Sequence, residues 1–293
     1  MKSTVDHIIF MVRDLPRSIE HYKVLLGRNP SWQGSHPAFK TKNALFRLQN
    51  TYLELLAEDQ ETIEKGTSTF VSEHISRHGT GLAGISFGTT DAAAMVTHMQ
   101  KYGIAALGPM PGEGSDDLTG TVRHWLNAFW PNTAARGIWT FGIQHLDPLD
   151  KLPIAPEVSP SDTTVTAVDH VVINTSDSAA AKKFYGDTLG IRLALDLPNH
   201  PLGHLMFFRT NKMNLEVVPK DHNEKEDKLW GIAYNTTNVD AAQDRLVKAG
   251  VKVSNVRIGM KPGTRVCTVK THNLDVPTLL IGPDSSKPYE NGT

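Results

Sequence analysis

Two histidines and two glutamates of the chain stand at repeated positions, and side chains of both types bind metal ions or transfer protons. His7 and His170 each follow the dipeptide Val-Asp inside an apolar stretch, and they are 163 residues apart. Glu54 comes 47 residues after His7, and Glu216 comes 46 residues after His170. Each glutamate interrupts an apolar segment, where an unpaired carboxylate is costly. The matched spacing predicts an internal duplication with one His–Glu pair in each copy.

The chemistry of these four side chains depends on how the two copies meet. A divalent metal held by histidine and carboxylate acts as a Lewis acid, and such a ligand set suits Fe, Mn, Ni or Zn. We predict four metal ligands, with both glutamates also catalytic: His7, Glu54, His170 and Glu216. If the copies share a cavity, all four ligands meet there. If neighbours in sequence pair, each cavity receives one histidine and one glutamate, and the metal needs a further ligand or is absent.

Further side chains are candidates for completing a metal site or for binding a substrate. Supplementary histidines occur in both halves of the chain: His36, His124, His145, His200, His204 and His272. We assign His36 and His204 to substrate binding, because they fall between the strands that carry the His–Glu pairs. Arg265 suits an anionic substrate, and Trp125 suits an apolar pocket wall. The alternatives for these four residues are solvated positions, surface ion pairs and ordinary core packing.

The elements that must position these residues follow one repeated order. Residues 5–12 read as a strand, and Asp14 can cap a helix that ends at Gly27. Three strands follow, with a turn at Asn50-Thr51, so the unit is β-α-β-β-β. Units of the same order begin near residues 82, 168 and 230, but glycine replaces histidine in the second and fourth units. Helices are expected at 70–78, 91–102, 178–189 and 239–249, and a loop at 109–114.

One segment separates the two halves of the chain. Residues 147–164 are rich in proline, aspartate, serine and threonine and show no hydrophobic period, which is typical of a linker. The first domain then spans residues 1–146 and the second spans 165–293, with a disordered tail after about residue 284. Each domain contains two of the four modules, and the fold class is α+β.

Composition excludes several classes of partner. The chain of 293 residues has a formal net charge of −1, which gives no electrostatic basis for binding nucleic acid or an anionic membrane. Cys267 is the single cysteine, so no internal disulfide forms and a reducing compartment is favoured. No signal peptide and no apolar run of about 18 residues is present. We predict a cytoplasmic protein with a small-molecule substrate, and the sequence leaves a homodimer open.

The four modules and their His–Glu pairs resemble the vicinal oxygen chelate superfamily, which includes glyoxalase I, extradiol dioxygenases and bleomycin resistance proteins. The resemblance covers nearly the whole chain, and its motifs are Val5-Asp6-His7, Tyr52-Leu53-Glu54-Leu55, Phe141-Gly142-Ile143-Gln144, Val168-Asp169-His170 and Pro262-Gly263-Thr264-Arg265-Val266. It implies that paired modules form a curved mixed sheet around a cavity. There, residues of the first and last strands would line a divalent metal that chelates adjacent oxygens of the ligand.

The resemblance also implies an enzyme, namely a metal-dependent lyase, isomerase or dioxygenase acting on a small oxygen-rich or aromatic molecule. One alternative is a resistance-type protein that binds a small ligand without turnover, and another is a degenerate scaffold without metal. Between the two domains we favour the first for the site, because it resembles the glyoxalase-like motif more strongly and its two units offer His36, His124 and His145, while His170 and Glu216 stay equal candidates.

Overall fold

The first module consists of one strand, one helix and three further strands. The computed structural model describes residues 1–61, 68–201, 203–220 and 225–284. Strand β1 (Thr4–Met11) leads into helix α1 (Leu15–Leu26), which begins where the Asp14 side chain accepts a hydrogen bond from the Arg17 amide. The helix ends at Gly27, whose φ of 73° is left-handed. Strands β2 (Trp32–His36), β3 (Thr41–Arg47) and β4 (Tyr52–Glu58) complete the module.

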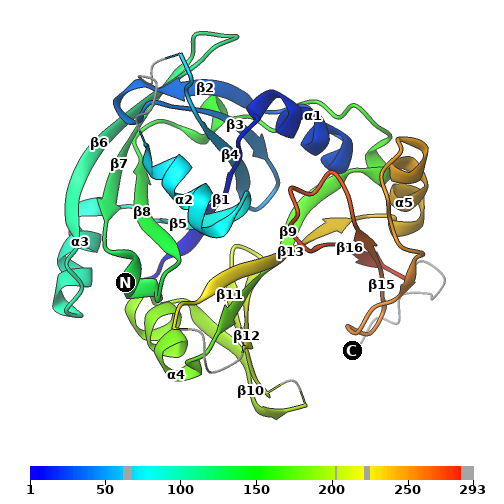
Figure 1. Ribbon diagram of the computed structural model, residues 1–293. Helices are drawn as coiled ribbons and strands as arrows, with labels where there is room; N and C mark the ends of the chain where they lie inside the picture. The colour runs from blue at the N-terminus through cyan, green and yellow to red at the C-terminus, as the bar shows by residue number, and fades with distance from the viewer. Residues whose placement is uncertain (62–67, 202, 221–224, 285–293) are drawn as a thin grey trace.

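The second module joins the first to form a closed barrel (Figure 1). After helix α2 (Phe70–His78) it contains β5 (Gly81–Gly88), α3 (Ala92–Lys101), β6 (Leu107–Asp116), β7 (Val122–Phe129) and β8 (Trp139–His145). The strand order around the barrel is β1-β4-β3-β2-β6-β7-β8-β5. Modules that are neighbours in sequence therefore pair, and the barrel contains one of the two predicted His–Glu pairs.

The third and fourth modules form a second eight-stranded sheet that stays open. The third contains β9 (Val165–Thr175), α4 (Ser178–Ala181), a π-helical turn (Lys182–Thr188), β10 (Arg192–His200), β11 (Gly203–Thr210) and β12 (Met213–Pro219). The fourth contains β13 (Lys228–Thr236), α5 (Val239–Lys248), β14 (Arg257–Ile258), β15 (Thr264–Val269) and β16 (Thr278–Pro283). The order is β10-β11-β12-β9-β13-β16-β15-β14. Two mixed sheets with few helices confirm the predicted α+β fold of four modules.

Strand β6 contradicts one prediction, because the sequence indicates a loop at residues 109–114. The glycines of this segment serve close packing of the strand. A Cβ added at Gly112 would lie 2.1 Å from the indole nitrogen of Trp125, and one at Gly114 would lie 3.1 Å from the same ring. Glycine therefore lets the Trp125 side chain lie flat on β6, and the proline and glycine content reflects that fit.

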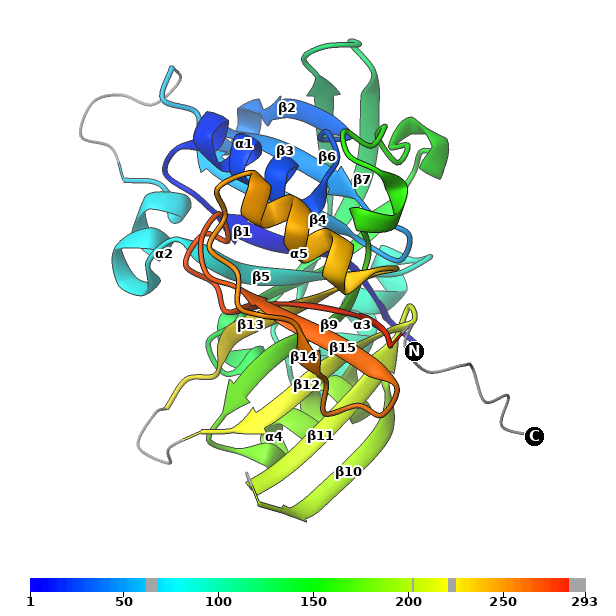
Figure 2. The same ribbon diagram turned by 90° about the vertical axis from the view of Figure 1, so that its right-hand side faces the viewer.

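The barrel and the second sheet lie one above the other in Figure 2. They are joined by polar contacts as well as by a shared apolar core. Arg245 of α5 donates hydrogen bonds to the carbonyl oxygens of Val24 and Leu25, at the end of α1. The Asn50 side chain bonds both backbone groups of Val168. Division of the chain at residues 147–164 stays a prediction. Among the described residues, no helix is both long enough and apolar enough to cross a membrane.

Candidate functional site in the barrel

The barrel encloses a cavity of about 480 Å³, a volume that suits a small organic ligand. Its wall is largely aromatic and contains Trp32, Phe39, Tyr52, Phe70, Trp125, Phe129, Trp139 and Phe141. Helix α2 contributes Phe70 to this wall and lies across the barrel in Figure 1. Against this apolar background, a few buried polar side chains mark the place where chemistry can occur.

The predicted pair His7 and Glu54 meets inside the cavity. Strands β1 and β4 are parallel neighbours in which His7 lies beside Tyr52, so Glu54, two residues further on, faces the same side. The distance from His7 Nε2 to Glu54 Oε2 is 3.4 Å, and the two residues are 3% and 8% exposed. The His7 ring stacks on Tyr52 at 4.6 Å and meets the edge of Phe141 at 5.8 Å. These contacts fix the orientation of the imidazole.

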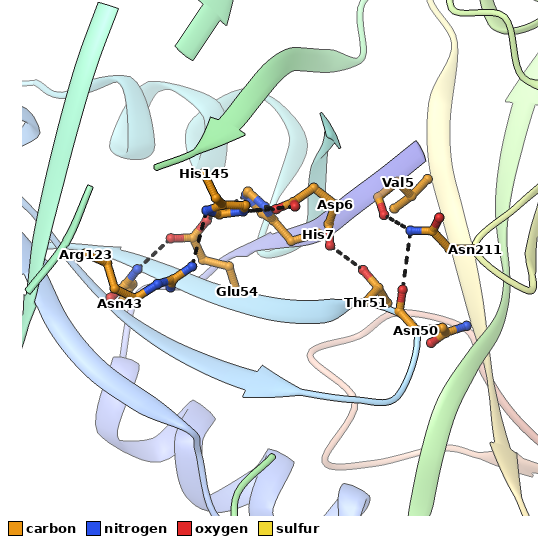
Figure 3. Close-up of polar contacts among 10 residues, drawn as sticks. All are labelled: Val5, Asp6, His7, Asn43, Asn50, Thr51, Glu54, Arg123, His145 and Asn211. Carbon is orange, nitrogen blue, oxygen red and sulfur yellow. Dashed lines mark hydrogen bonds and ion pairs between the residues drawn. The ribbon is translucent and has the colours of Figure 1, made fainter. Parts of the chain in front are cut away.

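A third charged residue, Asp6, joins the pair through a β-bulge. The register of β1 against β5 shifts between Val5 and His7, which leaves Asp6 without a cross-strand partner. Such a bulge re-aims side chains. The Asp6 carboxylate accepts hydrogen bonds from His7 Nδ1 at 2.7 Å and from His145 Nε2 at 3.0 Å (Figure 3). His7 therefore lies between two carboxylates, one on each ring nitrogen.

The pKa values follow from this arrangement. Burial by itself lowers the pKa of His7, but the hydrogen bonds to Asp6 and Glu54 outweigh burial and raise it to about 9. Burial by itself raises the pKa of Glu54, yet the contact with His7 lowers it to about 2. Despite burial, the pKa of Asp6 is also lowered, by its bonds to His145 and His7. At neutral pH the site is an imidazolium between two carboxylates.

The neutral side chains Asn43 and His36 lie on the other side of Glu54. Asn43 Nδ2 donates to Glu54 Oε1 at 2.7 Å and lies 3.4 Å from His36 Nε2. Burial lowers the pKa of His36, so this imidazole is neutral. His36 Nδ1 lies 3.1 Å from the Thr41 hydroxyl, and its ring meets the edge of Trp125 at 5.8 Å. The predicted substrate-binding residues His36 and Trp125 thus both line the cavity.

Arg123 of β7 completes a row of hydrogen-bonded side chains that crosses the cavity wall. Its Nη2 lies 3.4 Å from His145 Nδ1, and its guanidinium stands 5.5 Å from the centre of the Trp32 ring. Figure 3 shows the row Arg123, His145, Asp6, His7, Glu54 and Asn43. Sequence reasoning missed Asp6, Asn43 and Arg123. The repeated dipeptide Asp-His pointed to Asp6, whereas no local pattern pointed to Asn43 or Arg123.

The second domain repeats the pair in a more open setting. His170 Nε2 lies 3.4 Å from Glu216 Oε2, and His170 Nδ1 lies 2.8 Å from Asp169. The side chains of His170 and Glu216 are each 20% exposed, against 4% and 10% for His7 and Glu54. Burial raises the pKa of Glu216, and Leu205 stands at the strand position that Asn43 occupies in the first domain.

The other two predicted substrate-binding residues, His204 and Arg265, lie outside the cavity wall. His204 lies on strand β11 next to β10, and its Nε2 lies 2.6 Å from Asp196 Oδ1. Arg265 forms two contacts with Asp240 of helix α5, the shorter at 2.6 Å. Both contacts match the surface ion-pair alternative, and neither residue meets a His–Glu pair. Of the supplementary histidines, His145 joins the site and His124 pairs with Asp147 on the outside.

Comparisons with known proteins agree with this architecture. The model of the glyoxalase-like domain matches residues 5–189, which is more than half of the chain. The chain belongs to the glyoxalase-like domain family. The model of the glyoxalase/bleomycin resistance protein/dioxygenase superfamily also matches this glyoxalase-like protein, at residues 167–273. No match was found among curated protein sequences.

Solved structures similar to the glyoxalase-like protein share its fold at low identity. A mutant of 4-hydroxymandelate synthase from Streptomyces coelicolor has a TM-score of 0.67 at 12% identity, covering 98% of this chain and 94% of its own. A Mn(II)-bound glyoxalase from Novosphingobium aromaticivorans has a TM-score of 0.63 at 13% identity, and the match covers 96% of this chain and 83% of the glyoxalase. A hypothetical protein from Staphylococcus aureus has a TM-score of 0.64 at 14% identity, and the match covers 95% of this chain and 98% of that protein. At these identities the likeness shows the fold.

Among its described residues, the barrel of this family member brings together too few metal-ligand side chains to hold a divalent metal ion. Catalytic zinc, for example, has three protein ligands, and no three His, Cys, Asp or Glu side chains of the described ranges can hold one ion. Module pairing explains the shortage. Gly84 lies beside Trp139 as His7 lies beside Tyr52, so Gly84 and Phe141 take the positions that His7 and Glu54 take in the first module. Neither residue offers a metal ligand, and the metal roles stay predictions.

Proposed function

We propose that this glyoxalase-like protein is an enzyme of the lyase or isomerase class, which moves a proton at a carbon next to a carbonyl group of a small molecule. One observation carries the proposal: a buried imidazolium–carboxylate pair, His7 and Glu54, faces an aromatic cavity of about 480 Å³. A perturbed acid and base side by side in a cavity of ligand size are typical of a catalytic centre.

In the proposed mechanism, Glu54 is the base and His7 is the acid. The substrate carbonyl oxygen replaces Glu54 as the acceptor of the His7 Nε2 proton. Since the contact with His7 is what lowers the pKa of Glu54, losing that contact makes the buried carboxylate more basic. Glu54 then takes the proton from the carbon next to the carbonyl. The electron pair of that C–H bond moves onto the oxygen, where His7 stabilises the enolate by its charge and hydrogen bond.

The neighbouring side chains keep this pair in its reactive state. Asp6 holds the Nδ1 proton of His7 at 2.7 Å and so favours the imidazolium. Asn43 holds one oxygen of Glu54 at 2.7 Å, which leaves the other oxygen to the substrate. Returning the proton from Glu54 to the same or to an adjacent carbon yields an epimer or an isomer, and loss of a leaving group from the enolate yields a lyase reaction.

The donor set favours this chemistry over a dioxygenase reaction. Fe(II) oxygenases use a face of two histidines and one carboxylate that converge on one ion, and among the described residues no three His, Cys, Asp or Glu side chains converge in this way. The second candidate function, ligand binding without turnover, is favoured by the eight aromatic residues of the wall. The two functions differ in whether Glu54 is needed for a reaction or only for the shape of the cavity.

The test is exchange of carbon-bound hydrogen for deuterium. A panel of small ketones, hydroxyketones and carbonyl esters is incubated with the protein in D₂O, and exchange next to the carbonyl is followed by proton NMR. We expect Glu54→Gln to lose about 10²-fold or more of the exchange rate while the protein stays folded by circular dichroism. Saturable binding without exchange of any compound overturns the enzyme and supports the binding protein.

Metal analysis combined with the hydrogen-exchange assay tests the metal prediction. Purified protein is analysed for Fe, Mn, Ni and Zn and is then assayed before and after treatment with a chelator. The donor set predicts far less than one metal ion per chain and an exchange rate that the chelator does not change. One tightly held metal per chain, with activity lost on its removal and regained on its return, contradicts the metal-free mechanism.

A further inference from the structure

Arg123 is a buried cation that the proposed reaction does not use. It lies in the cavity wall and is 7% exposed, in the same cavity as His7 and Glu54. We infer that the cavity takes an organic carboxylate and that Arg123 binds its carboxylate group. This inference rests on the proposed function, since it names the class of the substrate for that site.

The contacts of Arg123 leave most of its donors unused. A guanidinium has five N–H donors, and the hydrogen bond of Arg123 to His145, at 3.4 Å, is long and uses one of them. Among the residues that the structure describes, no carboxylate oxygen lies within 4.0 Å of its nitrogens. A buried charge without such a partner is costly, unless a ligand supplies the partner.

Other arginines of the protein show how the fold satisfies a guanidinium when the structure needs only packing. Arg28 reaches Glu157 at 3.2 Å and also donates to the carbonyl oxygen of Val165. Arg136 reaches the buried Asp227 at 3.0 Å. Arg245 donates to carbonyl oxygens at the end of α1. Arg123 differs from all three, because its donors meet the cavity instead of a carboxylate or a helix end.

The position of Arg123 suits a planar anion. Its guanidinium carbon lies over the Trp32 ring, 5.5 Å from the ring centre, and this contact occupies none of the hydrogen-bond acceptors that its N–H groups need. A carboxylate fits two parallel N–H groups of a guanidinium. Through His145 and Asp6 the same hydrogen-bonded row leads to His7 (Figure 3), so the anion and the reacting carbon lie in one cavity.

The experiment compares phenylacetate with phenylacetamide, which has nearly the same shape and no charge. Binding of each compound is measured by isothermal titration calorimetry on the full chain. We expect wild-type protein to bind phenylacetate at least about tenfold more tightly than the amide, a difference of about 1.4 kcal/mol. Arg123→Gln removes this preference and leaves binding of the amide unchanged. The matched control is Arg209→Gln, an exposed arginine of the second domain, which keeps the preference.

Several results overturn the inference. These are equal binding of both compounds by the wild type, no saturable binding of phenylacetate, and a preference that survives in Arg123→Gln. If Arg123→Gln does not fold, Arg123→Lys takes its place. That variant keeps the charge but lacks the fork, and we expect it to keep part of the preference, whereas an undiminished preference counts against bidentate binding.

This result is separable from the proposed reaction. Glu54→Gln leaves Arg123 in place, so this variant should keep the preference for phenylacetate while it loses hydrogen exchange. A wild-type preference for the carboxylate without any exchange leaves the inference standing and overturns the proposed enzyme. Exchange of neutral compounds without a preference for the carboxylate leaves the proposed enzyme standing and overturns the inference.

Discussion

At the scale of single residues, the unusual feature is one imidazole between two carboxylates. Glu54 faces the cavity and can exchange its partner for a substrate, whereas Asp6 is held by His7 and His145 and stays in place. The two carboxylates therefore have separate roles. In the proposed mechanism, Asp6 sets the charge and orientation of His7, and Glu54 exchanges protons with the substrate.

The raised pKa of His7 predicts the pH dependence of both activity and stability. The protonated form stabilises the fold fully below pH 6.5, and this contribution is lost as the pH rises through about 9. We expect the rate of hydrogen exchange to be level at neutral pH and to fall with an apparent pKa near 9. In Asp6→Asn the fall should occur at lower pH, because one of the two carboxylates is gone. A rate that rises through pH 9 would show that neutral His7 is the active form.

At the scale of elements, a short seam between β2 and β6 closes the barrel. The strands are paired at Gly34 with Asp116 and at Ser35 with Ser115. A Cβ added at Gly34 would lie 2.1 Å from the carbonyl oxygen of Ser115, a backbone atom that cannot move away alone. The glycine is thus a requirement of closure, and closure is what gives the first domain its cavity.

This contact makes Gly34→Ala a test of the seam. We expect the substitution to lower the free energy of unfolding by about 1–3 kcal/mol in urea titrations, since backbone must shift to admit the methyl group. Binding of phenylacetate should weaken as well. Gly88→Ala is the control, because its nearest neighbour is the rotatable hydroxyl of Thr4 at 3.2 Å. Equal effects of the two substitutions would show that the seam is not specially sensitive.

Sequence patterns predict elements well where hydrophobic period and turn residues agree. The Asp14 cap, the Gly27 stop and the strands that carry His7 and Glu54 follow from local residues and were confirmed. Strand β6 was missed, because its prolines and glycines are typical of loops and their packing partner, Trp125, lies on another strand. Arg123 was missed for the same reason. Its position in the cavity wall depends on contacts between residues far apart in the sequence, and so does the lack of a carboxylate beside it among the described residues.

At the scale of the whole molecule, the duplicated domains differ in closure and in the surroundings of the same pair. The barrel buries His7 and Glu54 in the wall of its cavity, whereas the open sheet leaves His170 and Glu216 partly exposed. Charges near water interact weakly. The predicted choice of the first domain for the site rested on its stronger resemblance to the glyoxalase-like motif and on its histidines. It stays a prediction, and the cavity around His7 and Glu54 supports it with a physical reason.

We therefore expect Glu216→Gln to leave the rate of hydrogen exchange within about twofold of the wild type, while Glu54→Gln lowers it by about 10²-fold or more. The pair of variants is matched, because the two glutamates occupy corresponding strand positions. Kinetics of both variants with one exchanging compound provide the measurement. If Glu216→Gln were inactive and Glu54→Gln remained active, the site would lie in the second domain.

Closure by so short a seam also affects the timing of ligand exchange. The other strand junctions of the barrel pair over five or more residues, so parting β2 from β6 breaks the fewest interstrand bonds. Local opening takes the least stable route. The backbone amides around Gly34 and Ser35 should thus exchange with solvent before those of β1 and β4. Such an opening would remove one side of the cavity wall, so that the residence time of a bound molecule and its affinity could change independently.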